Sequence, residues 1–363
     1  MKRKLLIVMI IALISCMALA GCNKVAHEKG ASVPEHNNTR TITDLSGQEV
    51  VLPAASELNK VIIIAPPLLA TYANVVKDTE KLVGVHPRCI SDANQELLKL
   101  VVPNYKSINT SFLKGFTSNA EEILKMAPDV ILVYGDFQKK GLENIDIPIV
   151  DFFIKNPKNE DWSVQIDSLM REVFEITEQN TLQKEWDKAN EIVNEALKNI
   201  KDEDKKLAIM VRSNSEEMFT VRGGNYYGDD WLVKTGLINA AKDLKEDGAQ
   251  ISMEQLYEWN PEVVYDFLGA DADKYLANEI KGQDWDSVKA YENKQIYHMP
   301  EGMFNWGSPN VDSPLTLIWM TMKNYPDLIE EEFFNNYMKQ YYKRQYNIDL
   351  TDELMKSILN PQK

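Results

Sequence analysis

One pattern occurs twice in this chain, and it constrains the fold more than any other feature. Around Pro128 and again around Pro261, a helix-forming run meets a proline that is followed by an acidic residue and a short apolar run. Proline ends a helix because its ring clashes with the preceding turn and it lacks a backbone donor. Glu121 and Glu254 each stand seven residues before that proline. The repetition predicts two lobes of similar construction.

Short apolar runs bounded by turn-forming residues recur in both halves of the chain. They are Val61–Ala65, Leu82–Val85, Val130–Val133, Ile149–Phe153, Leu207–Val211, Met218–Val221, Val263–Phe267 and Gln295–Met299. Continuous apolar runs are typical of strands that are covered on both faces. Helical segments such as Asn119–Met126 lie between them, which predicts an α/β fold with two Rossmann-like α/β lobes. Residues 41–52, with Ser46 and Gly47 at the turn, predict a hairpin.

The composition changes between the two halves. Asp161–Ile176 and Thr181–Ile200 carry apolar residues at helical spacing, and Asn180 or Thr181 can cap the second helix. Twenty helical residues span about 30 Å. We expect this single long helix to join the lobes, although it could be a surface helix of one domain. Without an internal Gly or Pro it resists bending, so we expect little lobe closure when ligand binds.

The N-terminus carries a secretion signal. Three basic residues, Lys2, Arg3 and Lys4, precede an apolar run that is too short to cross a bilayer comfortably. The run ends in Leu-Ala-Gly-Cys, which resembles a bacterial lipobox, although Cys22 could follow an ordinary signal by chance. The resemblance implies removal of residues 1–21 and acylation of Cys22, which would anchor the protein to the outer face of the cell membrane. Residues 22–39 are polar and predict a flexible tether.

Charge and cysteine content exclude several classes of function. Loss of the signal takes three positive charges from a formal net charge of −15, which leaves about −18. Such an acidic chain does not suit nucleic acid. Cys16 leaves with the signal and Cys22 is the lipid site, so Cys89 cannot form an intramolecular disulfide. We expect Cys89 to be a small packed residue.

Together these features resemble the periplasmic-binding-protein class of iron–siderophore and cobalamin ABC importers. Trp306–Asp327 adds to the likeness, because Pro-Leu precedes a helix that bears Trp and ends in Tyr-Pro. The resemblance implies lobes at 40–160 and 205–327 with a cleft between them, a helical connection at 161–204, and an added tail at 328–363 packed on the second lobe. It implies a monomeric, extracytoplasmic lipoprotein that delivers a metal chelate to a permease and its ATPase. It implies neither enzymatic activity nor a resident cofactor.

Candidate ligand contacts lie in the loops that follow the predicted strands. They are Pro66, Tyr72, His86, Arg88 and Tyr134 in the first lobe, and Arg222, Tyr226, Tyr227, Trp231, His298 and Trp306 in the second. Aromatic faces suit a macrocycle or catecholate, and arginine suits anionic groups. The alternative is that half of these aromatics are core residues. The resemblance further implies that Glu121 and Glu254 pair with permease arginines, where the alternative is a solvated helix face.

Two other readings stay open. His86 and His298 could face each other and bind nickel or a haem iron, or each could be hydrogen-bonded structure. We find no nucleophile elbow, zinc-protease motif, Cys-x-x-Cys or P-loop, but counting residues does not exclude a carboxylate-pair hydrolase. Ferric siderophore, corrinoid, haem, nickel chelate and oxyanion all remain candidate ligands, in a cell with one membrane or two.

Overall fold

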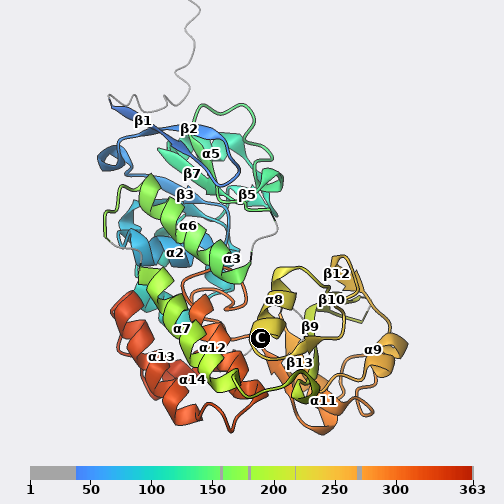
Figure 1. Cartoon of the computed structure of the whole chain (residues 1–363). Helices are drawn as coiled ribbons and strands as arrows, with labels where there is room; N and C mark the ends of the chain where they lie inside the picture. The colour runs from blue at the N-terminus through green and yellow to red at the C-terminus, as the bar shows by residue number, and fades with distance from the viewer. Residues whose placement is uncertain (1–37, 156–157, 179–180, 217, 268–271, 362–363) are drawn as a thin grey trace, which may run out of the picture. The chain divides into compact units, whose positions relative to one another are not determined.

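The structure is a computed structural model that describes residues 38–155, 158–178, 181–216, 218–267 and 272–361 (Figure 1). The signal, Cys22, most of the tether and Asn180 lie outside the described residues. Among the helices that are described, none combines the length and the apolarity that a membrane span requires.

Lobe 1 is built on a parallel sheet with strand order β4-β3-β7-β8. Its strands are β3 (Val61–Ile63), β4 (Leu82–Val85), β7 (Val130–Val133) and β8 (Ile149–Asp151). Ile62 and Ile63 are both fully buried but belong to separate apolar clusters, so both faces of the sheet are covered. This confirms the interpretation of the continuous apolar runs. The remaining elements are β1 (Thr39–Thr43), β2 (Glu49–Pro53), α2 (Leu68–Val75), α3 (Arg88–Ser91), α4 (Gln95–Val101), β5 (Leu113–Lys114), β6 (Thr117–Ser118) and α5 (Ala120–Met126).

Lobe 2 is built on a mixed sheet with strand order β12-β10-β9-β13-β14. Its strands are β9 (Leu207–Asn214), β10 (Phe219–Arg222), β11 (Ile238–Asn239), β12 (Asp247–Gln250), β13 (Val263–Asp266) and β14 (Ile296–His298). β11 and β13 run parallel to β9, whereas β10 runs antiparallel to β9 and to β12. The helices of this lobe are α8 (Tyr227–Lys234), α9 (Met253–Trp259), α10 (Ala272–Leu276) and α11 (Lys289–Glu292).

The repeated sequence pattern forms the same helix–turn–strand unit in each lobe. α5 and α9 each have seven residues and end at a residue in the left-handed region, Ala127 with φ 47° and Asn260 with φ 46°. A proline follows each, and the chain then enters β7 or β13, which lie inside their sheets. The left-handed residue turns the chain out of the helix, and the proline prevents its continuation.

Two helices carry the chain between the sheets. α6 (Asn159–Val173) packs against α2 of lobe 1, and α7 (Thr181–Leu197) packs against α12 (Ser313–Asn324), as Figure 1 shows. Trp186 of α7 stacks on Trp231 of α8, with ring centroids 5.9 Å apart. The predicted long helix is therefore α7, and it is preceded by a second helix that packs on lobe 1.

The C-terminal tail consists of α13 (Glu331–Tyr346) and α14 (Asp352–Leu359). Arg344 donates to both carboxylate oxygens of Glu185 on α7, at 2.7 and 2.8 Å. Asn74 of lobe 1 donates to the carbonyl oxygen of Gln345 at 2.5 Å. The expectation that the tail packs on the second lobe was incomplete, because these polar contacts also bind it to lobe 1 and to the connection.

A buried carboxylate lies where the tail meets α12. Asp312, directly before α12, is fully buried, and among the described residues its oxygens make no hydrogen bond of good geometry. Burial raises the pKa of Asp312 to about 7, although the Tyr342 and Tyr346 hydroxyls of α13 oppose part of that rise. The carboxyl group therefore binds a proton more tightly in the folded chain than in the unfolded chain.

We expect Asp312→Asn to remove a pH-dependent part of the folding free energy. The folded-state pKa of Asp312 lies above the usual value of 3.8, so its contribution to stability is complete below about pH 4 and is lost as the pH rises towards 7. Between pH 5 and 7.5 the variant should gain about 2 kcal/mol relative to the parent. Urea unfolding at both pH values measures this difference. A difference between variant and parent that stays constant with pH would contradict it.

Candidate functional site

A pocket of about 970 Å³ opens between the two lobes. The start of α4 shapes one wall, because Asn94 caps that helix by accepting from the amide of Leu97 at 3.1 Å. The lining comes from residues 88 and 91–96 of lobe 1, from Arg212, Ser213 and Met218 of lobe 2, and from Glu301, Phe304, Asn305, Ser357, Asn360 and Pro361. Its volume is within the range of small-molecule sites.

Arg212 is the basic residue of the pocket that the sequence interpretation missed. It lies on β9, is exposed, and makes no hydrogen bond or ion pair among the described residues. Its side chain packs closely over Gly248. A Cβ added at Gly248 would lie only 2.7 Å from the Arg212 Cδ. The available signal was its position directly after the predicted strand Leu207–Val211, because strand ends in such folds converge on the cleft.

The other charged groups of the pocket have partners. Arg88 Nε lies 2.6 Å from Asp92 Oδ2, and Glu96 pairs with Lys99 at 2.6 Å. Glu301 Oε1 lies 3.4 Å from a ring nitrogen of His298. The acidic side chains of the pocket are thus engaged, while Arg212 has no ion pair with any residue that the structure describes. Arg88 is the one residue of the predicted contact set that lines this pocket.

Arg222 has a structural role within lobe 2. It is 3% exposed, pairs with Asp247, and donates to the Tyr227 hydroxyl. Its guanidinium lies between two rings, 4.3 Å from the centroid of Tyr227 and 4.8 Å from that of Phe267. Gly228 permits this packing, because a Cβ there would lie 2.5 Å from the Arg222 Cγ.

An aromatic row runs from lobe 1 to lobe 2. Ring centroids are 5.6 Å apart for Tyr134 and Trp162, 5.3 Å for Trp162 and Tyr227, and 5.8 Å for Tyr227 and Phe267. Burial raises the pKa of Tyr227 to about 12, and burial also raises the pKa of Tyr134. Both phenols are therefore neutral at physiological pH in the ligand-free protein.

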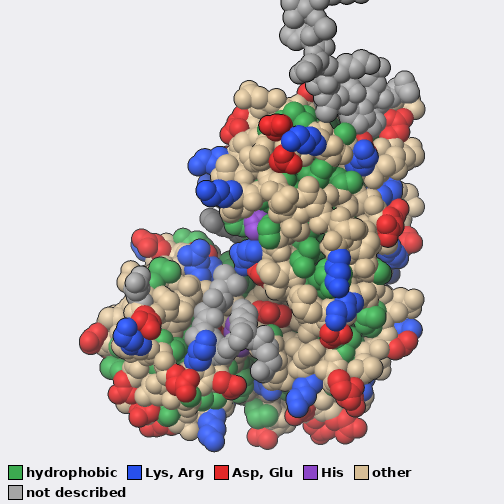
Figure 2. All heavy atoms as spheres, turned by 180° about the vertical axis from the view of Figure 1, so that it is seen from behind, with side chains coloured by type: hydrophobic (Ala, Val, Ile, Leu, Met, Phe, Trp, Pro, Cys, Tyr) green, Lys and Arg blue, Asp and Glu red, His purple; other side chains and the backbone are tan. Residues whose placement is uncertain are grey.

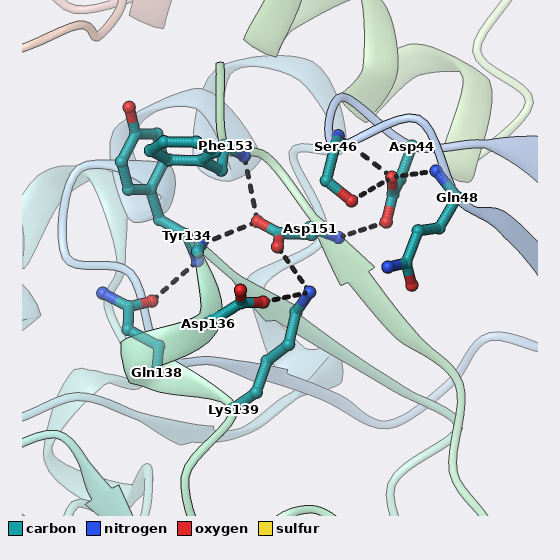
Figure 3. A network of polar contacts seen from close by, with 10 residues as sticks. Asp44, Ser46, Gln48, Tyr134, Asp136, Gln138, Lys139, Asp151 and Phe153 are labelled. Atoms are coloured by element: carbon teal, nitrogen blue, oxygen red, sulfur yellow. Dashed lines mark hydrogen bonds and ion pairs between the residues drawn. The ribbon is translucent and has the colours of Figure 1, made fainter. Parts of the chain in front are cut away.

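A buried carboxylate fixes the start of this row (Figure 3). Asp151, at the end of β8, accepts from the amides of Gly135 at 2.7 Å and Phe153 at 3.0 Å. Lys139 pairs with the same carboxylate at 2.7 Å. Because these contacts join the loops after β7 and β8, they hold Tyr134 in place.

Several predicted contact residues lie in the core or bond to their own lobe. Tyr72 and Trp231 are fully buried; Tyr72 donates to the carbonyl of residue 78 at 3.0 Å, and Trp231 donates to that of residue 307 at 3.0 Å. Trp306 and Pro66 are also buried, and Tyr226 donates to the carbonyl of residue 245 at 2.9 Å. None of these side chains lines the pocket between the lobes.

The two candidate histidines, His86 and His298, each have a polar partner within the protein. His86 is 4% exposed, accepts from the amide of Arg88 at 3.0 Å, and stacks on Phe116. Burial lowers the pKa of His86, which keeps the ring neutral. Within the described part of the chain, no three His, Cys, Asp or Glu side chains gather as metal ligands would. Cys89 is buried, as expected.

Glu121 and Glu254 occupy matching exposed positions. Glu121 is in the first turn of α5, and Glu254 is in the first turn of α9. Glu121 is 79% exposed, and its ion pair with Lys125 at 3.2 Å lies in solvent. On the face shown in Figure 2, acidic and basic side chains are interspersed.

Comparison with known proteins decides the family. The family described as "Periplasmic binding protein" matches residues 67–302, more than half of the chain. The chain belongs to this family. It is therefore an extracytoplasmic substrate-binding protein of an ABC importer and not an enzyme, which rules out the hydrolase interpretation.

Individual relatives of this periplasmic binding protein carry different names. It is 23% identical over 340 residues to the molybdate-binding protein MolA of Haemophilus influenzae, covering 85% of this chain and 93% of MolA. A periplasmic solute binding protein of Veillonella parvula is 27% identical, with a TM-score of 0.75, covering 89% of this chain and 97% of that one. A structure of Helicobacter pylori CeuE has a TM-score of 0.69 at 19% identity, covering 89% and 99%, and it shares the fold.

Proposed function

We propose that this protein captures a metal chelate of the siderophore or corrinoid class, one that bears anionic groups, in the pocket between its lobes. The observation that carries the proposal is Arg212, an arginine without a partner among the described residues, in a pocket whose carboxylates are engaged. A guanidinium binds carboxylate or catecholate oxygens through paired donors. A volume of about 970 Å³ is large enough for a chelate and far exceeds what a bare oxyanion fills.

Molybdate is the second candidate. The relative MolA is named as a molybdate-binding protein and aligns with most of this chain. The paired N–H groups of Arg212 could donate to a tetrahedral oxyanion. Such a ligand would occupy only part of the pocket, so water would have to fill the rest.

A binding panel separates these candidates. Purified protein is titrated with a ferric tris-catecholate, ferric citrate, cyanocobalamin and sodium molybdate, and tryptophan fluorescence and calorimetry are recorded. We expect saturable binding of a chelate at micromolar or lower concentration, without turnover. Binding of molybdate alone would establish the second candidate, and binding of none of the four would refute the chelate proposal.

We further propose a lipid anchor at Cys22, which lies outside the described residues. The support is the lipobox-like sequence Leu-Ala-Gly-Cys after a short apolar run. Cys22→Ser should leave the chain unprocessed or release it from the membrane fraction. A mature Cys22→Ser chain that still partitions into detergent would contradict the anchor.

A further inference from the structure

The C-terminal helix α14 reaches the ligand pocket. Ser357, Asn360 and Pro361, at its end, line the same space as Arg212. These residues lie beyond residues 67–302, which match the family. Part of the pocket wall is thus made by a segment outside the matched region.

Asn94 joins this wall to lobe 1. Its side-chain amide donates to the Ser357 hydroxyl at 2.9 Å, and its backbone amide donates to the carbonyl of Gly302 at 2.8 Å. Its side-chain oxygen caps α4. One residue thus fixes α4, the 301–305 loop and α14, all of which border the pocket.

A backbone hydrogen bond and apolar packing hold α14 in place beside the pocket. The amide of Glu301 donates to the carbonyl of Ile358 at 2.9 Å, and Ile358 is fully buried. Leu354 and Met355 are also buried in the main apolar cluster. Together these contacts hold the end of α14 against the pocket.

We propose that α14 limits the size of ligand that this protein accepts, with Asn360 at the wall and Asn94 as the residue that positions it. This inference rests on the proposed function for the identity of the ligand. Asn360 is exposed and lines the pocket, so a larger side chain there takes space from the ligand without disturbing the core. Bulky ligands then lose affinity while small ones do not.

The test of the wall compares a large probe with a small one. Asn360→Trp should weaken binding of a ferric tris-catecholate at least tenfold and leave binding of ferric citrate within twofold, since the smaller chelate needs less of the pocket. Lys356→Trp places the same bulk at an exposed position of α14 that does not line the pocket, and it serves as the control. Unchanged binding of the large probe, or equal losses for Asn360→Trp and Lys356→Trp, would overturn the role of α14.

The test of Asn94 needs no ligand. Ser357→Ala removes the acceptor for Asn94 and also the bond that the Ser357 hydroxyl donates to the Leu354 carbonyl at 2.8 Å. Hydrogen exchange should become faster in residues 352–359 and, as the change that reports on Asn94, around residue 302. Ser107→Ala, which removes an exposed hydroxyl from another part of lobe 1, is the control and should leave both segments unchanged. Unchanged exchange in Ser357→Ala would overturn the positioning role even if the probes bind. Failure of all probes to bind would refute the proposed function and leave this measurement valid.

Discussion

Arg212→Ala is expected to lower the affinity for an anionic ferric chelate by at least tenfold. A hydrogen bond to a charged group contributes roughly 1.5–3 kcal/mol, which corresponds to about 10- to 150-fold in Kd. Arg212 has no ion pair among the described residues, so binding the ligand breaks no such pair. Titration of both proteins with the ferric tris-catecholate measures the ratio of dissociation constants.

Two controls make the Arg212 result specific. Arg212→Lys keeps the charge but loses the paired donors, so we expect an intermediate affinity. Lys289→Ala removes an exposed charge of lobe 2 that does not line the pocket, and we expect no change. Equal affinities in Arg212→Ala and the parent would mean that the chelate does not bind through this residue.

Reversing the charges of Glu121 and Glu254 is expected to reduce uptake more than tenfold while ligand binding is retained. We propose that Glu121 and Glu254 meet basic residues on the permease, because both are exposed at the same turn of duplicated helices. Two lysines there would oppose like charges at the permease surface, which costs several kcal/mol. Uptake in cells should fall more than tenfold in the Glu121→Lys, Glu254→Lys double variant, with Kd within about twofold of the parent.

The matched control reverses two other exposed acids. Glu195 on α7 and Glu353 on α14 are exposed and lie outside the two duplicated helices, so their reversal changes net charge by the same amount. We expect normal uptake from that variant. The docking proposal fails if both double variants transport equally well.

The sequence predicted the elements well because their signals are local. β4 and β7 have the predicted bounds, and α5 begins one residue after the predicted start. Apolar runs, capping residues and prolines act within a few residues of one another, so one sequence reveals them. The antiparallel pairing of β10 depends on distant partners and was not predicted.

The site was predicted less well because strand ends do not specify which side chains face the cleft. Arg212 and Arg222 lie on neighbouring strands, yet Arg212 lines the pocket and Arg222 is buried between two rings. Tyr72 and Trp231 lie on helices whose inward faces are decided by the packing of the whole lobe. Chemical type alone could not separate these cases, because arginine and aromatic residues serve both binding and structure.

The tail makes a second link in addition to α6 and α7, because it contacts lobe 1, α7 and the loop after β14, where the amide of Glu301 donates to the carbonyl of Ile358. Arg344, Asn74 and Asn94 all contribute to it. We expect a carrier joined at two places to present nearly the same outer surface to its transporter whether it is empty or loaded. Empty carriers would then compete with loaded ones for the permease. Uptake would therefore depend on the fraction of carriers that hold ligand, and producing more carrier at a fixed ligand supply would slow import.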